Sequence, residues 1–117
     1  MIHCYARIST DKQEHFNQES VLFSRYPDAK IHSEIVSGAS KAKPVLELLL
    51  TQLNSGDTLV VTSLDRLGRK VSQLVLLLDD LHKRGINFIS LRESVDYSTA
   101  TGRMVTQMME AFAEMER

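Results

Sequence analysis

The apolar run TLVVTSL, residues 58–64, constrains the fold more than any other stretch of this chain. A strand that is apolar along nearly its whole length has no side suited to water, so both of its faces must be covered. That arrangement is typical of a parallel sheet with helices packed on each side. We therefore expect residues 58–64 to form a central strand of such a sheet.

Strand and helix patterns alternate along the rest of the chain. Residues 2–8 have the two-residue period of a strand, with Tyr5 and Arg7 on the same side. Further strands are predicted at residues 30–36 and 86–91, and helices at residues 14–26, 44–55, 70–84 and 102–117. This order predicts an α/β fold with a mainly parallel four- to five-stranded sheet, helices on both faces, and a C-terminal helix that is cut short.

The first three helices each carry apolar residues at helical spacing, which we expect to face the core. They are Phe16, Val21, Leu22 and Phe23 in the first helix, Val45, Leu46, Leu48, Leu49, Leu50 and Leu53 in the second, and Val71, Leu74, Val75, Leu78 and Leu81 in the third.

Composition narrows the class of protein. At 117 residues with 43% hydrophobic and 25% charged residues, the chain suits a single globular domain. The single cysteine, Cys4, excludes an internal disulfide and fits a reducing compartment, so a cytoplasmic location is expected. No apolar run approaches the roughly 20 residues of a membrane helix, and no membrane partner is expected. The net charge of −1 means that any phosphate chemistry must rest on local basic clusters.

Polar and basic side chains follow three of the predicted strands. They are Ser9, Thr10 and Gln13 after the first strand, Glu34, Ser37, Lys41 and Lys43 at and after the end of the second, and Asp65, Arg66, Arg69 and Lys70 after the third. Ligands of parallel sheets bind beyond the carboxyl ends of the strands, where these loops gather. The sequence therefore predicts a site with one well-placed hydroxyl and a ring of cations.

Arg7 lies two residues, about 7 Å, before Ser9 along the first strand. A guanidinium group pairs with two phosphate oxygens at once and stays protonated, which suits an anionic substrate whose charge grows during attack. Each residue also has a plainer interpretation when it is taken alone. Arg7 could bridge to a carboxylate, Ser9 could cap the next helix, and residues 65–69 could be an ordinary helix start.

The four histidines do not point to a catalytic base or a metal site. His3 would lie roughly 20 Å along the strand from Ser9, and His15, His32 and His82 are expected at the surface or at helix ends. The chain has no zinc-type spacing and no glycine-rich phosphate-binding motif. No metal and no cofactor is therefore expected.

Four stretches of the chain resemble the catalytic domain of the serine recombinases, the resolvase and invertase family. They are YARIST at residues 5–10, SG at residues 37–38, GDTLVVTSLDRLGR at residues 56–69 and GRMVTQMMEAFAEMER at residues 102–117. The resemblance implies that Ser9 attacks a DNA phosphodiester and becomes a 5′-phosphoserine, while Arg7, Arg66 and Arg69 hold the phosphate. It also implies active-site positions for Tyr5, Gln13, Gln18, Ser37 and Asp65, with Lys43 and Lys70 as further cations.

Some positions depart from the family pattern. Lys43 stands where arginine is common and offers a point charge in place of a fork. Gln52 replaces a residue that is often basic, Glu34 replaces an aspartate, and Cys4 replaces a glycine.

The resemblance also implies an organisation and a set of partners. Residues 1–100 would be the catalytic core and residues 101–117 the start of a long dimerisation helix, with a DNA-binding domain absent from this chain. Double-stranded DNA would be the partner, bound by a homodimer that forms a tetramer in the active complex. The apolar face that would form the dimer interface comprises Met104, Met108, Met109, Phe112 and Met115.

Two other functions compete with a recombinase. One is a catalytically silent oligomerisation module that regulates such an enzyme, which the departure at Lys43 favours. The other is a receiver-type phosphotransfer domain, which would require acidic residues at the first strand end, where Ser9 stands. The sequence does not distinguish resolution, inversion and integration.

Overall fold

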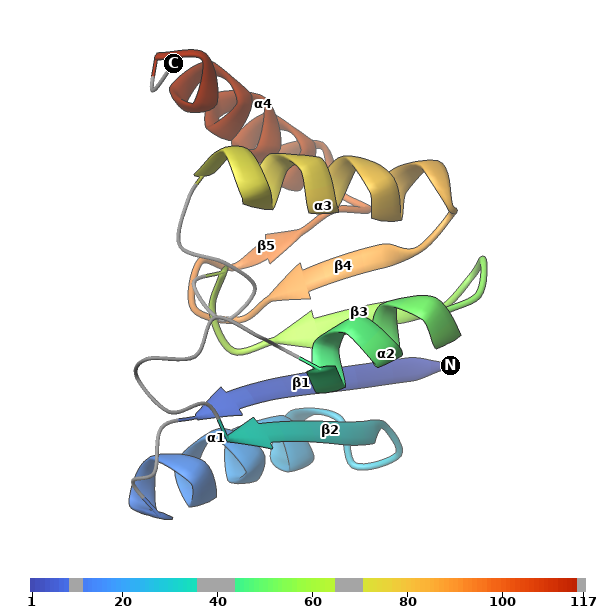
Figure 1. Cartoon of the computed structure of the whole chain (residues 1–117), viewed down its shortest axis with the longest axis vertical. Coiled ribbons are helices and arrows are strands. Elements are labelled where there is room, and N and C mark those ends of the chain that lie inside the picture. The colour runs from blue at the N-terminus through green and yellow to red at the C-terminus, as the bar shows by residue number, and fades with distance from the viewer. Residues whose placement is uncertain (9–11, 36–43, 65–70, 116–117) are drawn as a thin grey trace.

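The computed structural model describes residues 1–8, 12–35, 44–64 and 71–115, apart from the side chains of residues 8, 12–18, 110 and 113. Strands and helices alternate through most of these residues (Figure 1). The elements are β1 (Ile2–Ile8), α1 (Lys12–Arg25), β2 (Lys30–Ile35), α2 (Pro44–Gln52), β3 (Thr58–Val61), α3 (Val71–Lys83), β4 (Asn87–Ser90), β5 (Val95–Asp96) and α4 (Ala100–Met115). The predicted α/β class is confirmed.

The sheet has the strand order β2-β1-β3-β4-β5. The first four strands are mutually parallel, and β5 runs antiparallel to β4. The apolar run at residues 58–64 supplies β3, the middle strand, where Leu59, Val60 and Val61 are fully buried. The two-residue strand β5 lies inside the polar stretch 92–101, where the sequence pattern predicted no element, because two residues are too few to show a period.

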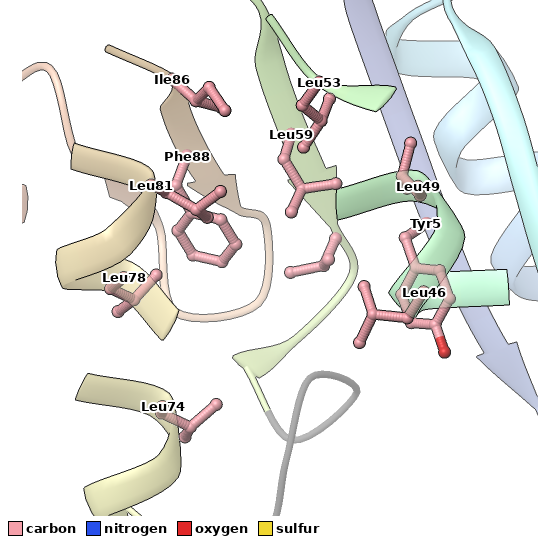
Figure 2. Packing of buried hydrophobic residues seen from close by; sticks show 11 residues of the cluster. Tyr5, Leu46, Leu49, Leu53, Leu59, Leu74, Leu78, Leu81, Ile86 and Phe88 are labelled. Atoms are coloured by element: carbon pink, nitrogen blue, oxygen red, sulfur yellow. The ribbon is translucent and has the colours of Figure 1, made fainter. Parts of the chain in front are cut away.

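Helices cover both faces of the sheet. On one face, α1 packs against β1 and β2 over a small core of Cys4, Ala6, Leu22 and Val60. On the other face, α2 and α3 enclose a larger core with residues of β1, β3 and β4, and Figure 2 shows Tyr5 beside Leu46 of α2. None of the helices in the described residues is long and apolar enough to cross a membrane.

The helix faces differ in part from the predicted stripes. In α1, Leu22 is fully buried, whereas Val21 and Phe23 are 48% and 62% exposed. In α2, Leu46 and Leu49 are buried and Leu48 is 59% exposed. The prediction was wrong for Val21, Phe23 and Leu48 because neighbouring helical residues point about 100° apart, so one face cannot hold a whole apolar run.

The ends of α2 and α3 are joined by one arginine. Gly85, at φ 75°, ends α3, and the amides of Gly85 and Ile86 donate to the carbonyls of His82 and Leu81 as in a Schellman motif. Arg84 then donates from Nη2 to the carbonyls of Leu50 and Leu53, at 2.8 and 2.9 Å. Arg84, at the end of α3, therefore caps the C-terminus of α2.

His32 does not lie freely at the surface as predicted. It is half-buried on β2, and its ring stacks on that of His3 at a centroid distance of 5.4 Å, with His3 Nδ1 and His32 Nε2 3.2 Å apart. His3 also lies 3.7 Å from the carboxylate of Asp57. This cluster lies at the amino-terminal end of β1, the opposite end from Ile8, which agrees with excluding His3 as a base for Ser9.

The helix α4 begins at Ala100, two residues before the predicted start. The side-chain oxygen of Thr99 accepts from the amide of Gly102 at 3.0 Å, which is an N-cap. Gly102 is buried against β5, and a Cβ atom there would lie 2.0 Å from the carbonyl oxygen of Asp96. Glycine at this position therefore lets α4 approach the sheet edge closely.

Candidate active site

The arrows of β1, β2, β3 and β4 all point the same way in Figure 1, so the carboxyl ends of these four strands lie on one side of the sheet. Residue 9 follows β1 directly, residue 36 follows β2 directly, and residue 65 comes four positions after the end of β3. Most of the predicted site lies outside the described residues, namely Ser9, Ser37, Lys43, Asp65, Arg66, Arg69 and Lys70. Gln13 and Gln18 lie in α1, but their side chains are also outside the description.

Arg7 is the predicted phosphate ligand that the structure places. It is half-buried, on the residue before the last of β1, and its Cα pairs with that of Glu34 on β2. Tyr5 lies two residues earlier on the same strand and therefore on the same side of the sheet. Its ring is fully buried, and its hydroxyl donates to Glu34 Oε2 at 2.6 Å.

Glu34 links the two strands to the start of α2. Glu34 is 5% exposed, and its carboxylate accepts from the Tyr5 hydroxyl and from the amides of Val45 and Leu46, the last two at 3.0 and 3.4 Å. These amides belong to the first turn of α2, so Glu34 acts as a helix cap supplied by another element. The cap also fixes the start of α2 against β2.

The sequence holds a clue to this capping role of Glu34, which an analysis of apolar periodicity does not detect. The residue before Pro44 is Lys43, which is not a helix-capping type, so the first amides of α2 need an acceptor from elsewhere. The sequence places Glu34 among the polar residues at the strand ends and in place of an aspartate, but it does not predict a helix cap there. A side chain longer by one methylene reaches these amides from β2.

The family of the chain follows from a comparison over its whole length. The protein-family model described as "Resolvase, N terminal domain" matches residues 2–117. The chain belongs to this family. The strand ends that carry Arg7 and Glu34 therefore belong to a resolvase-family domain.

Several curated relatives share this domain. DNA-invertase hin of Salmonella typhimurium is 46% identical over 113 residues, which are 97% of this chain and 59% of the relative. The transposon Tn552 resolvase of Staphylococcus aureus is 43% identical over 115 residues, 97% of this chain and 58% of that protein. A probable DNA-invertase, y4cG, of Sinorhizobium fredii is 47% identical, with 37% of its length covered. This chain thus spans between about a third and three fifths of the length of these relatives.

A solved structure gives the same result for the fold. The N-terminal catalytic domain of TP901-1 integrase superposes with a TM-score of 0.75 at 29% identity, over 99% of this chain and 95% of that one. A resolvase-family site-specific recombinase from Streptococcus pneumoniae gives a TM-score of 0.70 at 23% identity and supports the fold alone.

The structure also places Cys4, which stands where the family pattern has glycine. Cys4 is fully buried, and burial raises the pKa of its thiol to about 11, so it is not a nucleophile at neutral pH. No group of three or more His, Cys, Asp or Glu residues suited to a metal ion occurs in the described part of the chain.

The predicted interface residues divide into two groups on α4. Met104, Met108, Phe112 and Met115 are between 55% and 79% exposed. Met109 instead packs against the core of its own chain, on the side of α4 that also carries buried Thr106. The helix therefore completes the core with one face and leaves a second apolar face uncovered.

Proposed function

We propose that this resolvase-family domain is the catalytic domain of a site-specific DNA recombinase, with Ser9 as the nucleophile. The observation that carries the proposal is the family match over residues 2–117. It is supported by the position of Arg7 at the carboxyl end of β1, two residues before Ser9 in the sequence. Double-stranded DNA is the proposed substrate.

In the proposed reaction, Ser9 Oγ forms a bond to a DNA phosphorus atom and the bond from that phosphorus to the 3′ oxygen breaks. The serine gives up its proton, and the 3′ oxygen takes one to become a hydroxyl. The product is a phosphoserine ester at the 5′ end. Because this ester stores about as much energy as the DNA ester that it replaces, a 3′ hydroxyl can attack it and rejoin the strand without a nucleotide cofactor.

Positive charge stabilises the transition state in this scheme. Arg7, Arg66 and Arg69 are proposed to pair with the oxygens of the scissile phosphate, which carry the developing charge. Half-burial of Arg7 favours this role, because a partly desolvated site strengthens the attraction between a guanidinium group and a phosphate. Lys43 would add a point charge, and Asp65 would accept the serine proton or orient an arginine.

The remaining predicted residues receive supporting roles in the proposal. Gln13, Gln18, Ser37 and Lys70 would contact the phosphate or its neighbours along the DNA backbone. For Tyr5, the hydrogen bond to Glu34 supports a different part, in which the tyrosine holds the strand end that carries Arg7.

The uncovered face of α4 supports assembly into dimers, and into tetramers in the active complex. Met104, Met108 and Phe112 recur every four residues on this face, with Met115 beside them. Exposed apolar surface of this kind is costly in water, and methionines adapt readily to a partner.

Assembly is tested by placing a charge on this face. Met108→Glu should convert a dimer to a monomer in sedimentation velocity at high protein concentration, with the unfolding midpoint of the monomer unchanged. Glu114→Gln, on the same helix, is the control. An unsubstituted chain that stays monomeric at every concentration contradicts the proposed use of this face.

The activity is tested with the chain fused at Arg117 to a DNA-binding domain of known target site. Denaturing gels of a reaction stopped at cleavage should show protein attached to 5′ DNA ends. Ser9→Ala should abolish the adduct, and Ser24→Ala, which removes an exposed hydroxyl of α1, should leave it. An adduct that survives Ser9→Ala refutes the assignment. Assembly without any adduct favours the silent regulatory module.

A further inference from the structure

A second carboxylate lies beside the point at which the chain leaves β3. The amide of Leu64, the last described residue before Asp65, donates to Glu93 Oε1 at 3.2 Å. The same oxygen accepts a hydrogen bond from the hydroxyl of Ser90. Ser90 is the last residue of β4 and is fully buried, so one end of this link is fixed in the sheet.

Backbone hydrogen bonds extend this contact along both segments. The amides of Leu91 and Arg92 donate to the carbonyls of Val61 and Thr62, at 3.1 and 2.9 Å. The pairing of β3 with β4 thus continues past the ends of both strands. Beyond the last of these backbone hydrogen bonds, the Glu93 carboxylate accepts from the Leu64 amide and continues the contact between the two segments.

The turn that presents Glu93 has an unusual backbone. Ser94, the next residue, has φ 55°, in the left-handed region that non-glycine residues rarely adopt, and its amide donates to the carbonyl of Leu91 at 3.2 Å. Backbone outliers of this kind persist where surrounding contacts hold them, and they cluster at functional sites. Glu93 is itself an exposed residue, and next to this turn its carboxylate accepts from both the Leu64 amide and the Ser90 hydroxyl.

We propose that Glu93 is a positioning residue for the arginines that follow Leu64. This inference rests on the proposed function, in which Arg66 and Arg69 bind the scissile phosphate. Glu93 does not touch the DNA. It acts through the Leu64 amide, by fixing the place and direction in which the chain enters the segment that carries both arginines.

The first arm of the test measures the contact itself, on the 117-residue chain. Amide hydrogen exchange followed by NMR should show slow exchange at Leu64, increased at least tenfold by Glu93→Ala. Glu93→Gln, which keeps an acceptor oxygen, should largely restore protection. Asp28→Ala is the matched control, because it removes an exposed carboxylate beside β2, the outer strand on the other side of the sheet from β5. It should leave the exchange rate of the Leu64 amide unchanged.

The second arm measures the rate of phosphoserine formation with the fusion protein. Glu93→Ala should lower the rate at saturating DNA by about ten- to a hundredfold while half-saturation is unchanged, since a small misplacement of charged groups costs this much. Glu93→Gln should recover most of the rate. A variant that only loosened the fold would not give this split with rescue by glutamine.

The outcomes separate the two claims. Fast Leu64 exchange with an unchanged rate in Glu93→Ala overturns the positioning role, and unchanged exchange overturns the contact. A rate that survives Ser9→Ala refutes the proposed function instead, while the exchange arm still decides the contact. Should Glu93→Ala fail to fold, Glu93→Asp, whose shorter side chain withdraws the oxygen from Leu64, replaces it with the same expected losses.

Discussion

Removing the Tyr5 hydroxyl tests whether this tyrosine supports the sheet edge or is available to phosphate. Tyr5→Phe keeps the ring, which is fully buried among Leu46, Leu59 and other core residues, and withdraws only the donor that lies 2.6 Å from Glu34 Oε2. No cavity larger than the hydroxyl results. The change in stability therefore reports on the interactions of this hydroxyl, among them the hydrogen bond to Glu34.

The expected magnitude follows from the surroundings of Glu34. A hydrogen bond to a charged group contributes about 1.5 to 3 kcal/mol, and a buried carboxylate that loses a donor keeps its cost of desolvation. Glu34 retains the amides of Val45 and Leu46, at 3.0 and 3.4 Å, which soften the loss. We therefore expect Tyr5→Phe to lower the free energy of unfolding by about 1.5 to 2.5 kcal/mol.

The assay is urea unfolding followed by circular dichroism, with the slope m held constant between variants. Tyr26→Phe, at a half-buried tyrosine on the α1 face, is the control and should cost less than about 1 kcal/mol. Repeating Tyr5→Phe in the Glu34→Gln background should reduce the effect to roughly 1 kcal/mol, because the acceptor is then neutral. A decrease in the free energy of unfolding below about 0.5 kcal/mol for Tyr5→Phe alone would refute the supporting role. The alternative, in which the Tyr5 hydroxyl contacts the phosphate, would then be favoured.

Three further predictions concern other parts of the chain. Gly102→Ala should destabilise the fold by about 1 to 3 kcal/mol or more in the same assay, because its Cβ would meet the Asp96 carbonyl oxygen at 2.0 Å; an unchanged midpoint contradicts this packing. The pKa of His32 lies below its ordinary value of 6.5 because burial and the nearby His3 and Lys30 disfavour the cation. The unfolded state therefore binds more protons just below pH 6.5, so stability should fall as the pH drops through that range, and His32→Asn should flatten this part of a pH series of unfolding curves. Lys43→Ala should slow cleavage by the fusion protein roughly ten- to a thousandfold, while Lys43→Arg keeps the rate; cleavage by Lys43→Ala at the unmodified rate removes this residue from the site.

The sheet could be predicted from the sequence because its strands have strong local patterns. The run at residues 58–64 identified β3 as central, since only a strand covered on both faces has that composition. The same argument missed β5, whose two residues are held by pairing with Ile89 and Ser90 and not by any period of their own.

Side-chain environments were less predictable, because they depend on contacts between distant segments. Tyr5 shares a strand face with Arg7, yet its hydroxyl is committed to a glutamate 29 positions away. His32 has a polar neighbourhood in sequence, and the parallel register of β1 and β2 still places it against His3. Glu93 gave no signal at all, since its partner Leu64 is also 29 residues distant.

The central claim is that Ser9 becomes covalently attached to DNA, and mass spectrometry of the adduct tests it most directly. After nuclease treatment and trypsin digestion, the DNA remnant should be carried by the peptide of residues 8–12, which lies between the cleavage sites at Arg7 and Lys12. That peptide has two hydroxyl side chains, so fragmentation must place the remnant on Ser9 and leave Thr10 unmodified. A remnant on Thr10, on Tyr5 or on any other peptide would contradict the account.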